Sequence, residues 1–586
     1  MKKATEVKPQ SHTYSFTQIK KAAILYMALP LLCYLIGFLR WYFAIISCAA
    51  LIFVLWKTLK GNEDRTPDLH QKDPSQFLIP LKTVLLVFLF SLIWSYLGGM
   101  NGYFYQSTDW DCRNAVYFDL IRYDWPIIYE QNGAALVYYV GHWLPPATIA
   151  KLIQNLTGSI EAGRFIGRML LWFWSSAGLT IIILMIYRVV GAQTAKARIA
   201  ATLIFVFFSG MDIIGALIRN TTGDVFAPDH LHLEWWMRGF QYTSIMACLF
   251  WVFNQAIIPW MITLCFLTDE NPRNYVFYAT SCLLCGTLPC FGLVMLMLVK
   301  AVTFIIQKRK QKETDRILPG IFSAQNLVTF LVIFPMITAY LLSANTFRDV
   351  FGDRLPLFGN RTMVEEAIQT PGELSNEKIQ GLTETEEDTK TTEENRENKD
   401  ENTVMNAPAP EQPKYKVFFI PYSILGLFLF VGLEVGIYML LIWTDHRKDP
   451  LFYAIGVFFF IIPFIHIGRS YDFCMRASIP SLFILMLYVN RFLLEHFPRK
   501  TGSTQKRFHS KEEKNKRILA ICLAVCLAFG AVTPIVEIYR GIQHVIESKT
   551  IFLENQNLMT FNVDWIQNSY ECSNPKEHFF FRYLAG

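Results

Sequence analysis

Long runs of apolar residues recur along almost the whole chain and constrain its fold more than any other sequence feature. Each run holds roughly 16 to 27 residues, and a helix needs ~20 residues to cross the ~30 Å hydrocarbon core of a bilayer. Hydrophobic residues make up 53% of the 586 residues and charged residues only 17%, whereas soluble globular chains carry about 25% charge. The sequence therefore predicts an all-α polytopic membrane protein and excludes fibrous, nucleic-acid-binding and small disulfide-stapled proteins.

The apolar runs predict about thirteen transmembrane helices. Their expected ranges are 22–39, 41–57, 82–99, 168–190, 199–218, 242–267, 275–289, 291–307, 322–344, 417–443, 450–467, 473–494 and 517–538. The neighbouring ranges 275–289 and 291–307 allow two interpretations. They form either a tight hairpin broken at Pro289 or one long kinked helix, because proline interrupts helical hydrogen bonding.

Basic residues in the short loops set the expected orientation, because cytoplasmic loops carry an excess of Lys and Arg. If the N-terminus is cytoplasmic, most of these residues fall on the inner side, among them Lys57, Lys60, Arg188, Lys196, Lys308, Arg309, Lys310, Arg447, Lys448, Arg499 and Lys500. The same arrangement places most acidic residues outside. We therefore expect a cytoplasmic N-terminus.

This orientation divides the chain into six parts. They are 1–99 with the first three spans, an outer loop at 100–167, a membrane core at 168–344 with the outer loop 219–241, an outer loop at 345–416, the last spans at 417–538, and an outer tail at 539–586. Residues 365–401 are rich in Glu, Thr and Asn without aromatic residues, which predicts disorder. Residues 133–153 are apolar but interrupted by His142 and Pro145-Pro146, which favours an interfacial helix.

The first polar cluster lies in the outer loop, in the stretch DWDCRNAVYFDLIRYDW at 109–125. At helical spacing Asp111 and Asn114 would share a face, as would Asp119 and Arg122. A solvated acidic loop and a functional site are both compatible with this stretch. Asp109 and Asp111 are the candidate catalytic residues.

The second cluster lies in the outer loop 219–241 and combines carboxylates, imidazoles and a guanidinium. Its candidate substrate-binding residues are Asp229, His230, His232, Glu234 and Arg238. On a helix His230 and Glu234 would share a face. These residue types can contact a polar substrate or hold a divalent metal, and a purely structural loop is the third interpretation.

The third cluster, HIGRSYDFCMR at 466–476, spans the outer ends of two consecutive spans. It supplies the candidate substrate-binding residues His466, Arg469, Asp472 and Arg476. Asp472 and Arg476 are spaced to pair with each other on a helix. Alternatively, Arg476 binds an anion, because a guanidinium makes bidentate contacts to phosphate and stays charged when partly desolvated.

The layout resembles the GT-C superfamily of membrane glycosyltransferases, which have a cytoplasmic N-terminus and acidic residues early in a long first outer loop. Asp109 and Asp111 in the DWD motif match those acidic residues. In most of the family this loop follows the first span, whereas here it follows the third expected span.

The resemblance implies transfer of a sugar from a polyprenyl-phosphate carrier to an acceptor hydroxyl on the outer face of a bacterial plasma membrane. Asp109 or Asp111 would act as general base, and Arg238, Arg469 or Arg476 would stabilise the departing lipid phosphate. Asp229 or Glu234 would hold sugar hydroxyls or a divalent metal. The partners implied are the carrier lipid and an acceptor glycan, lipid or protein, with no nucleic acid.

Two other functions remain open at the sequence level. Polar residues near the middle of expected spans, Asn254, Gln255 and Glu434, favour a transporter or lipid flippase, because ionisable groups at membrane depth mark transport pathways. A non-catalytic scaffold is the third possibility, with the acidic stretch 365–401 recruiting partners.

Overall fold

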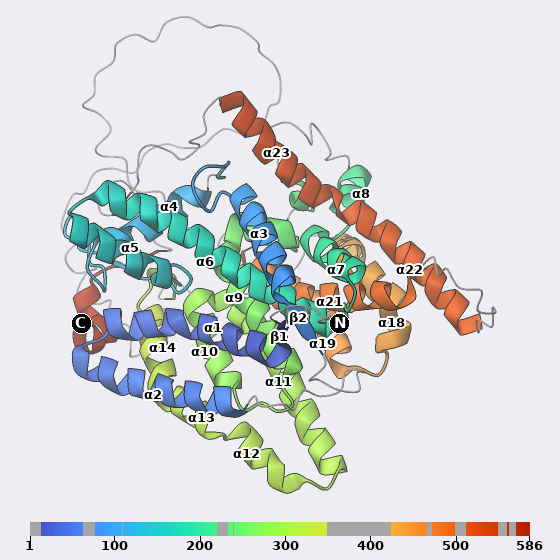
Figure 1. Ribbon diagram of the computed structural model, residues 1–586, viewed down its shortest axis with the longest axis horizontal. Coiled ribbons are helices and arrows are strands. Elements are labelled where there is room, and N and C mark those ends of the chain that lie inside the picture. Colours follow the sequence, from blue (N-terminus) through green and yellow to red (C-terminus); the bar gives the residue numbers. More distant parts are fainter. Residues whose placement is uncertain are drawn as a thin grey trace, which may run out of the picture.

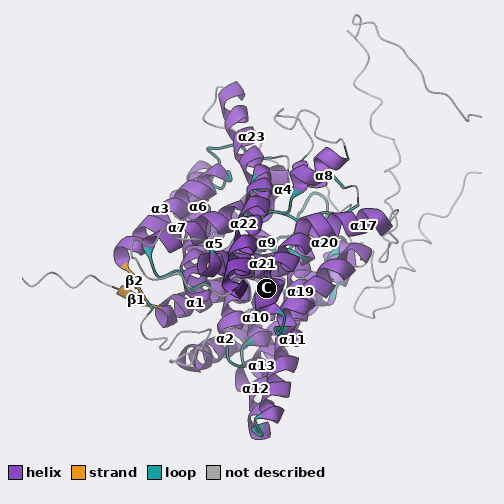
Figure 2. Ribbon diagram, turned by 90° about the vertical axis from the view of Figure 1, so that its right-hand side faces the viewer, coloured by secondary structure: helices purple, strands orange, loops and turns teal. Residues whose placement is uncertain are grey.

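The computed structural model describes residues 13–61, 77–107, 109–219, 232–237, 239–347, 424–465, 472–497, 511–548, 560–561 and 570–586. The stretch 365–401, for which the sequence predicts disorder, lies outside the described residues. The described residues are almost entirely helical, and the short strands β1 and β2 lie together at one edge (Figure 2).

The helices of the first half, in chain order, are α1 (Phe16–Phe38), α2 (Trp41–Gly61), α3 (Leu81–Leu97), α4 (Asp109–Arg122), α5 (Leu144–Thr157), α6 (Ile160–Val189), α7 (Ala195–Phe207), α8 (Asp212–Ile218), η2 (Leu233–Trp235), α9 (Ile245–Thr268), α10 (Tyr275–Cys285) and α11 (Thr287–Lys310). Those of the second half are η3 (Thr314–Arg316), α12 (Ile317–Ile321), α13 (Ala324–Val328), η4 (Thr329–Ile333), α14 (Phe334–Leu342), α17 (Ile424–Val431), η6 (Gly432–Gly436), α18 (Ile437–His446), α19 (Pro450–Ile461), η7 (Ile462–Phe464), α20 (Asp472–Ala477), α21 (Ile479–His496), α22 (Lys511–Gly530), α23 (Val532–Ser548), η8 (Pro575–Glu577) and η9 (Phe580–Leu584). The strands are β1 (Thr13–Ser15), β2 (Leu78–Pro80), β3 (Ala135–Leu136) and β4 (Glu571–Cys572).

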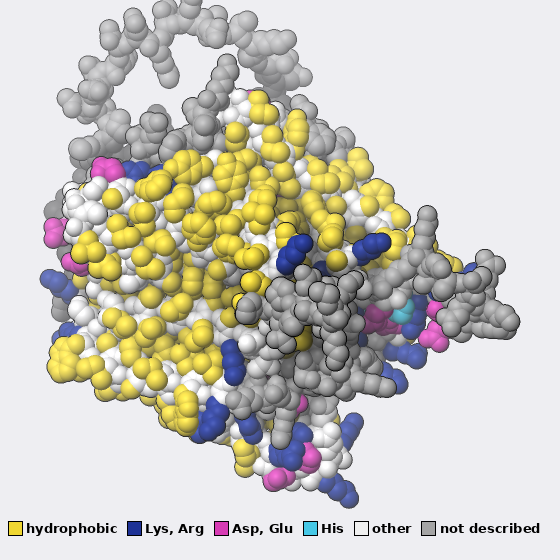
Figure 3. All heavy atoms as spheres, in the orientation of Figure 1, with side chains coloured by type: hydrophobic (Ala, Val, Ile, Leu, Met, Phe, Trp, Pro, Cys, Tyr) yellow, Lys and Arg dark blue, Asp and Glu magenta, His cyan; other side chains and the backbone are white. Residues whose placement is uncertain are grey.

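The described part of the chain contains 9 helical segments that are long and apolar enough to cross a membrane. Shorter apolar helices occur at Leu81–Leu97, Tyr275–Cys285 and Pro450–Phe464. Hydrophobic side chains cover a broad area of the face formed by α1, α2, α3 and α6 (Figure 3). The chain is thus an all-α polytopic membrane protein, as the sequence predicts, while the number thirteen and the orientation remain predictions.

Helix α9 forms the centre of the bundle, and 94% of its most apolar window is buried. Helices α6, α10, α11 and α21 pack around it, as the crossing ribbons show (Figure 1). The backbone of α9 is non-helical at Val252, with φ −139° and ψ 35°. This kink matters for the site because polar groups gather on both sides of it.

Residues 275–307, for which the sequence allowed two interpretations, form two helices. The helical structure is interrupted at Gly286 and not at Pro289. Gly286 has extended backbone with φ 176°, which ends α10 and begins α11. Pro289 sits inside the first turn of α11, where a missing N–H group costs nothing because the first amides of a helix have no intrahelical partner.

The prediction of an interfacial helix over 133–153 is wrong for residues 133–143. Ala135 and Leu136 form β3, which pairs antiparallel with β4, Ala135 opposite Cys572. Helix α5 starts only at Leu144, with Pro145 and Pro146 in its first turn. The two prolines thus begin the helix, which is the position that tolerates them.

Segment 570–586 folds back onto the start of the bundle, where Figure 1 places its end beside the turn between α1 and α2. The backbone N–H of Gly586 donates to the carbonyl of Phe38 at 3.1 Å. The guanidinium of Arg40 donates to the carbonyls of Arg582 and Ala585, each at 3.0 Å. Together with the β3–β4 pairing, these contacts hold Tyr570 next to β3.

Candidate functional site

The DWD motif forms the first turn of α4, as helix geometry favours, because carboxylates stabilise the positive end of a helix dipole. Asp109 Oδ2 lies 3.1 Å from Nη2 of Arg113 one turn later, and the two side chains are 49% and 5% exposed. Trp110 anchors the turn by donating from Nε1 to the carbonyl of Phe250 at 3.0 Å, just before the kink in α9. Helix α4 thereby holds a buried guanidinium beside a half-exposed carboxylate.

The third predicted cluster supplies a second pair of the same kind. Arg476 Nη2 lies 3.1 Å from Oδ1 of Asp472 within α20, which is the pairing that the spacing allowed. Arg476 also donates from Nη1 to the hydroxyl of Tyr139 at 3.1 Å. The same hydroxyl accepts from Nε2 of Gln255 at 3.2 Å, so α20 and α9 meet at Tyr139.

Three tyrosines connect the two pairs. The hydroxyl of Tyr138 donates to that of Tyr139 at 2.5 Å, and the ring of Tyr138 stacks on Tyr570 with centroids 4.3 Å apart. The charges of Arg113 and Arg476 both act on Tyr138 and Tyr570. We call Arg113, Tyr138, Tyr139, Arg476 and Tyr570 the arginine–tyrosine cluster.

The arginine–tyrosine cluster has unused hydrogen-bonding capacity. Nη1 of Arg113 and Nε of Arg476 are buried, and neither donates to any of the described residues. Burial alone would lower the pKa of Arg113, but the charge and hydrogen bond of Asp109, together with Tyr570 and Tyr138, outweigh burial and raise that pKa. Two permanently charged guanidiniums with unused N–H groups suit an anion with several oxygens, such as a phosphate.

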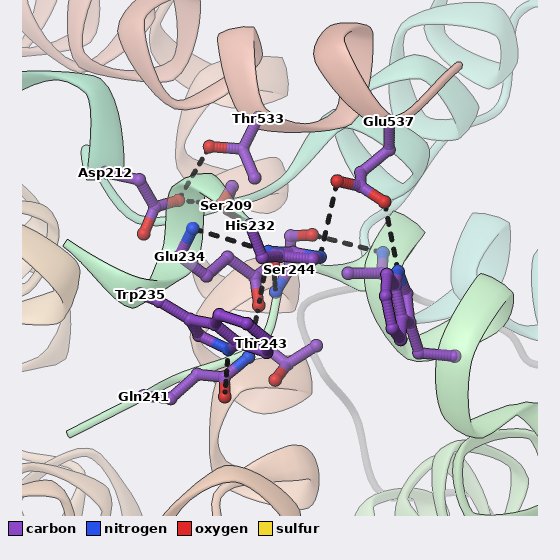
Figure 4. Close-up of polar contacts among 12 residues, drawn as sticks. Ser209, Asp212, His232, Glu234, Trp235, Gln241, Thr243, Ser244, Thr533 and Glu537 are labelled. Atoms are coloured by element: carbon purple, nitrogen blue, oxygen red, sulfur yellow. Dashed lines mark hydrogen bonds and ion pairs between the residues drawn. The ribbon is translucent and has the colours of Figure 1, made fainter. Parts of the chain in front are cut away.

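A second set of polar side chains lies buried on the other side of the α9 kink and is drawn in Figure 4. Glu234 Oε1 accepts from the backbone N–H of Ser244 at 2.9 Å, and its Oε2 accepts from Nε2 of Gln241 at 2.9 Å. Nε2 of His232 lies 3.3 Å from Glu537 on α23. We call His232, Glu234, Gln241, Ser244 and Glu537 the buried acid cluster.

The buried acid cluster is tied to the helices around it. Trp251 Nε1 donates to Glu537 Oε2 at 3.0 Å, and Arg540 Nη1 donates to Glu537 Oε1 at 3.3 Å. Burial raises the pKa of Glu234 to about 7, although His232 and two hydrogen bonds act in the opposite direction. Glu234 is therefore a carboxyl that can gain or lose a proton near neutral pH.

The structure separates the predicted site residues into two places. Asp109 and Asp111 lie on α4, Asp472 and Arg476 belong to α20, and His232 and Glu234 lie in the buried acid cluster. His232 caps the short helix η2, with Nδ1 accepting from the N–H of Glu234 at 3.4 Å. The remaining candidates lie outside the described residues; they are Asp229, His230, Arg238, His466 and Arg469.

Seven residues of these two clusters were not among the candidate site residues of the sequence, namely Arg113, Tyr138, Tyr139, Gln241, Ser244, Glu537 and Tyr570. Arg113 had a usable signal, because it follows Asp109 by four residues and lies on the same helical face. Tyr570 and Glu537 had none, since only tertiary packing brings them to Tyr138 and to His232.

In the part of the second predicted cluster that the structure describes, no three metal-binding side chains lie within 4.8 Å of one another. Among the described residues, the group of three metal-binding side chains within 4.8 Å of one another is Asp445, Glu495 and His496. Nζ of Lys516 lies 2.9 Å from Oδ1 of Asp445 and Nε2 of His496 lies 2.6 Å from Oδ2. Both oxygens of that carboxylate thus already have partners.

Comparison with known proteins gives no relative of this chain: no protein-family model, no curated protein and no solved structure matches it.

Proposed function

We propose that the protein is a membrane glycosyltransferase of GT-C type, which moves a sugar from a polyprenyl-phosphate carrier to an acceptor hydroxyl at the outer face of a bacterial plasma membrane. The observation that carries the proposal is that the charges of Arg113 and Arg476, from distant parts of the chain, act on the same two tyrosines, Tyr138 and Tyr570. Unused N–H groups on both guanidiniums match the oxygens of a lipid phosphate.

The reaction follows from these groups. The acceptor oxygen forms a bond to the anomeric carbon while the bond from that carbon to the phosphate oxygen breaks. Arg113 and Arg476 stabilise the negative charge on the departing lipid phosphate, which needs no proton. The tyrosine hydroxyls donate to sugar or phosphate oxygens, and the apolar helices around the cluster accommodate the lipid tail.

The acceptor hydroxyl must lose its proton, and we assign the general base to Asp111. Asp109 carries the charge that balances Arg113 at 3.1 Å, so its carboxylate positions that arginine. Asp111 lies in the same first turn of α4 and is within electrostatic reach of Cys112, whose thiol contacts Tyr570. A positioned carboxylate of this kind contributes ~10²–10⁴-fold to rate.

The test is transfer or hydrolysis of labelled polyprenyl-phosphate sugars by the purified protein in lipid nanodiscs. We expect R113A and R476A each to lower the rate ~100-fold or more, and R476K to restore it only in part, because lysine makes no bidentate contact. D111N should lower it ~100-fold or more and D109N less.

A matched control exists within the chain. Arg491 pairs with Glu495 at 2.8 Å with the same spacing of four residues, but it lies at the far end of α21. R491A should keep the wild-type rate. Wild-type rates in both R113A and R476A, or no turnover of any polyprenyl-phosphate sugar, would exclude the proposed reaction.

The second candidate function is a proton-coupled transporter. It is favoured by Glu434, a carboxyl that is 1% exposed inside an apolar helical segment. Uptake of labelled solutes into proteoliposomes under an imposed pH gradient separates the two functions. A transporter would lose uptake in E434A and keep it in R113A. A glycosyltransferase would lose sugar transfer in R113A and keep it in E434A.

A further inference from the structure

Two buried carboxyls from distant parts of the chain meet at the junction of α7, α8 and η6. Asp212 begins α8 and Glu434 lies in the middle of η6, and each is 1% exposed. The carboxyl of Glu434 lies so close to Gly210 that a Cβ there would overlap it, and the N–H of Met211 donates to the carbonyl of Leu433 at 3.3 Å. Residues 210–212 and 433–434 are thus adjacent, and the carboxyl of Asp212 lies within hydrogen-bonding reach of that of Glu434.

The hydrogen-bond donors around the pair are unevenly shared. Asp212 Oδ2 accepts from Ser209 Oγ at 2.8 Å and from Thr533 Oγ1 at 2.7 Å (Figure 4). Of the described donors, only Nε1 of Trp236 reaches Oε1 of Glu434, at 2.8 Å. Asp212 Oδ1 and Glu434 Oε2 are buried, and no donor among the described residues reaches either of them.

Two such oxygens cannot satisfy each other, because a carboxylate oxygen accepts hydrogen bonds and donates none. Two ionised carboxylates in contact in a buried site repel strongly, and one of them then keeps a proton. The titratable groups that face the pair are Glu234, Tyr242, Tyr438 and Cys474. None of these carries a positive charge that would offset two ionised carboxylates.

A cation between the two oxygens is either a proton or a metal ion. Hard metal ions need about six to eight oxygen ligands, but the surroundings are mainly aromatic: Trp236 packs near Phe430, and Tyr438 near Phe208. The carbonyl of Ser209 already accepts from the hydroxyl of Tyr438 at 2.9 Å. These surroundings suit a proton shared between the two carboxyls better than a metal ion, which would need more oxygen ligands.

We propose that Asp212 and Glu434 form a proton-binding site, in which Glu434 carries one shared proton on Oε2 and donates it to Oδ1 of Asp212. Asp212 is the ionised partner because two hydroxyls already donate to its other oxygen. The proton joins three segments, since Asp212 lies at the α7–α8 corner, Glu434 on η6, and Thr533 on α23. The site does not depend on the proposed glycosyltransferase activity.

The direct measurement is the infrared absorption of protonated carboxyl groups in the purified protein at neutral pH. The difference spectrum between wild type and E434Q isolates the contribution of this side chain from other buried acids such as Glu234. We expect a carboxylic-acid C=O band that wild type shows and E434Q lacks, and that shifts in D212N because its acceptor changes. E495Q, at an exposed carboxylate on α21, should leave the spectrum in this region unchanged.

Stability gives a second readout. In E434Q the amide can donate from Nε2 to Asp212 and accept from Trp236, so its melting midpoint should stay near that of wild type. E434L has similar size but cannot donate, and its midpoint should fall clearly below both. An absent difference band, or equal destabilisation in E434Q and E434L, would overturn the proposal. So would a melting midpoint that Na⁺, Mg²⁺ or Ca²⁺ raises in wild type but not in E434Q, because that result identifies a metal site.

Discussion

At the scale of a single residue, Glu234 links stability to pH. Its pKa is raised from 4.5 to about 7 by burial, so the folded state binds a proton that the unfolded state releases at lower pH. The stability that this proton contributes is complete below pH 4.5 and is lost as pH rises through about 7. We expect the melting midpoint of wild type to fall between about pH 5 and about pH 8.

The variant E234Q should flatten this part of the profile. At low pH it should be about as stable as wild type, because the amide resembles the protonated carboxyl: each offers Gln241 and Ser244 one full acceptor and carries a donor. Thermal melts across the pH range measure both effects. E547Q, at an exposed glutamate on α23, should reproduce the wild-type profile; an unchanged slope in E234Q would show that another group titrates.

At the scale of elements, a side-chain hydrogen bond joins α4 to α9 two residues before the kink at Val252. Trp110 Nε1 donates to the carbonyl of Phe250, and its ring stacks on Phe253 with centroids 4.9 Å apart. W110F keeps the stacking and removes this hydrogen bond between α4 and α9. We expect a loss of ~0.5–1.5 kcal/mol in stability, measured by chemical or thermal unfolding in detergent.

The control for this prediction is W443F. Trp443 is 47% exposed and donates to Tyr453 at 3.2 Å near the surface, so water replaces its lost partner. Equal stability of W110F and wild type would mean that the kinked backbone does not need the indole of α4.

The same elements show what sequence reasoning can and cannot reach. The apolar runs predicted the helical, membrane-embedded class because burial in a bilayer leaves a strong local pattern. The break at Gly286, the kink at Val252 and the strand at 135–136 were not predicted, since each depends on packing against distant residues. Arg476 was proposed from its local spacing, whereas Tyr570 joins the arginine–tyrosine cluster only through the β3–β4 pairing.

At the scale of the whole molecule, the arginine–tyrosine cluster depends on segment 570–586, whose end is held by hydrogen bonds at the α1–α2 turn. Arg40, at the turn between α1 and α2, holds the carbonyls of Arg582 and Ala585 and thereby the end of the segment that carries Tyr570. We expect R40A to speed amide hydrogen exchange across 570–586 while leaving α9 protected. R316A, at an arginine that is 62% exposed, should change neither region.

If Arg40 acts through Tyr570, its effect on the proposed sugar transfer must disappear once Tyr570 is gone. A displacement of about 1 Å at a reacting group can cost ~100-fold in rate, so R40A and Y570A should each slow transfer. Residues that act through one contact are not additive, and the double variant R40A/Y570A should therefore be no slower than Y570A alone. If the rate losses of the two single variants instead multiply in the double variant, Arg40 and Tyr570 contribute to activity by separate routes. The hydrogen bonds of Arg40 would then support the membrane bundle directly, and not through Tyr570.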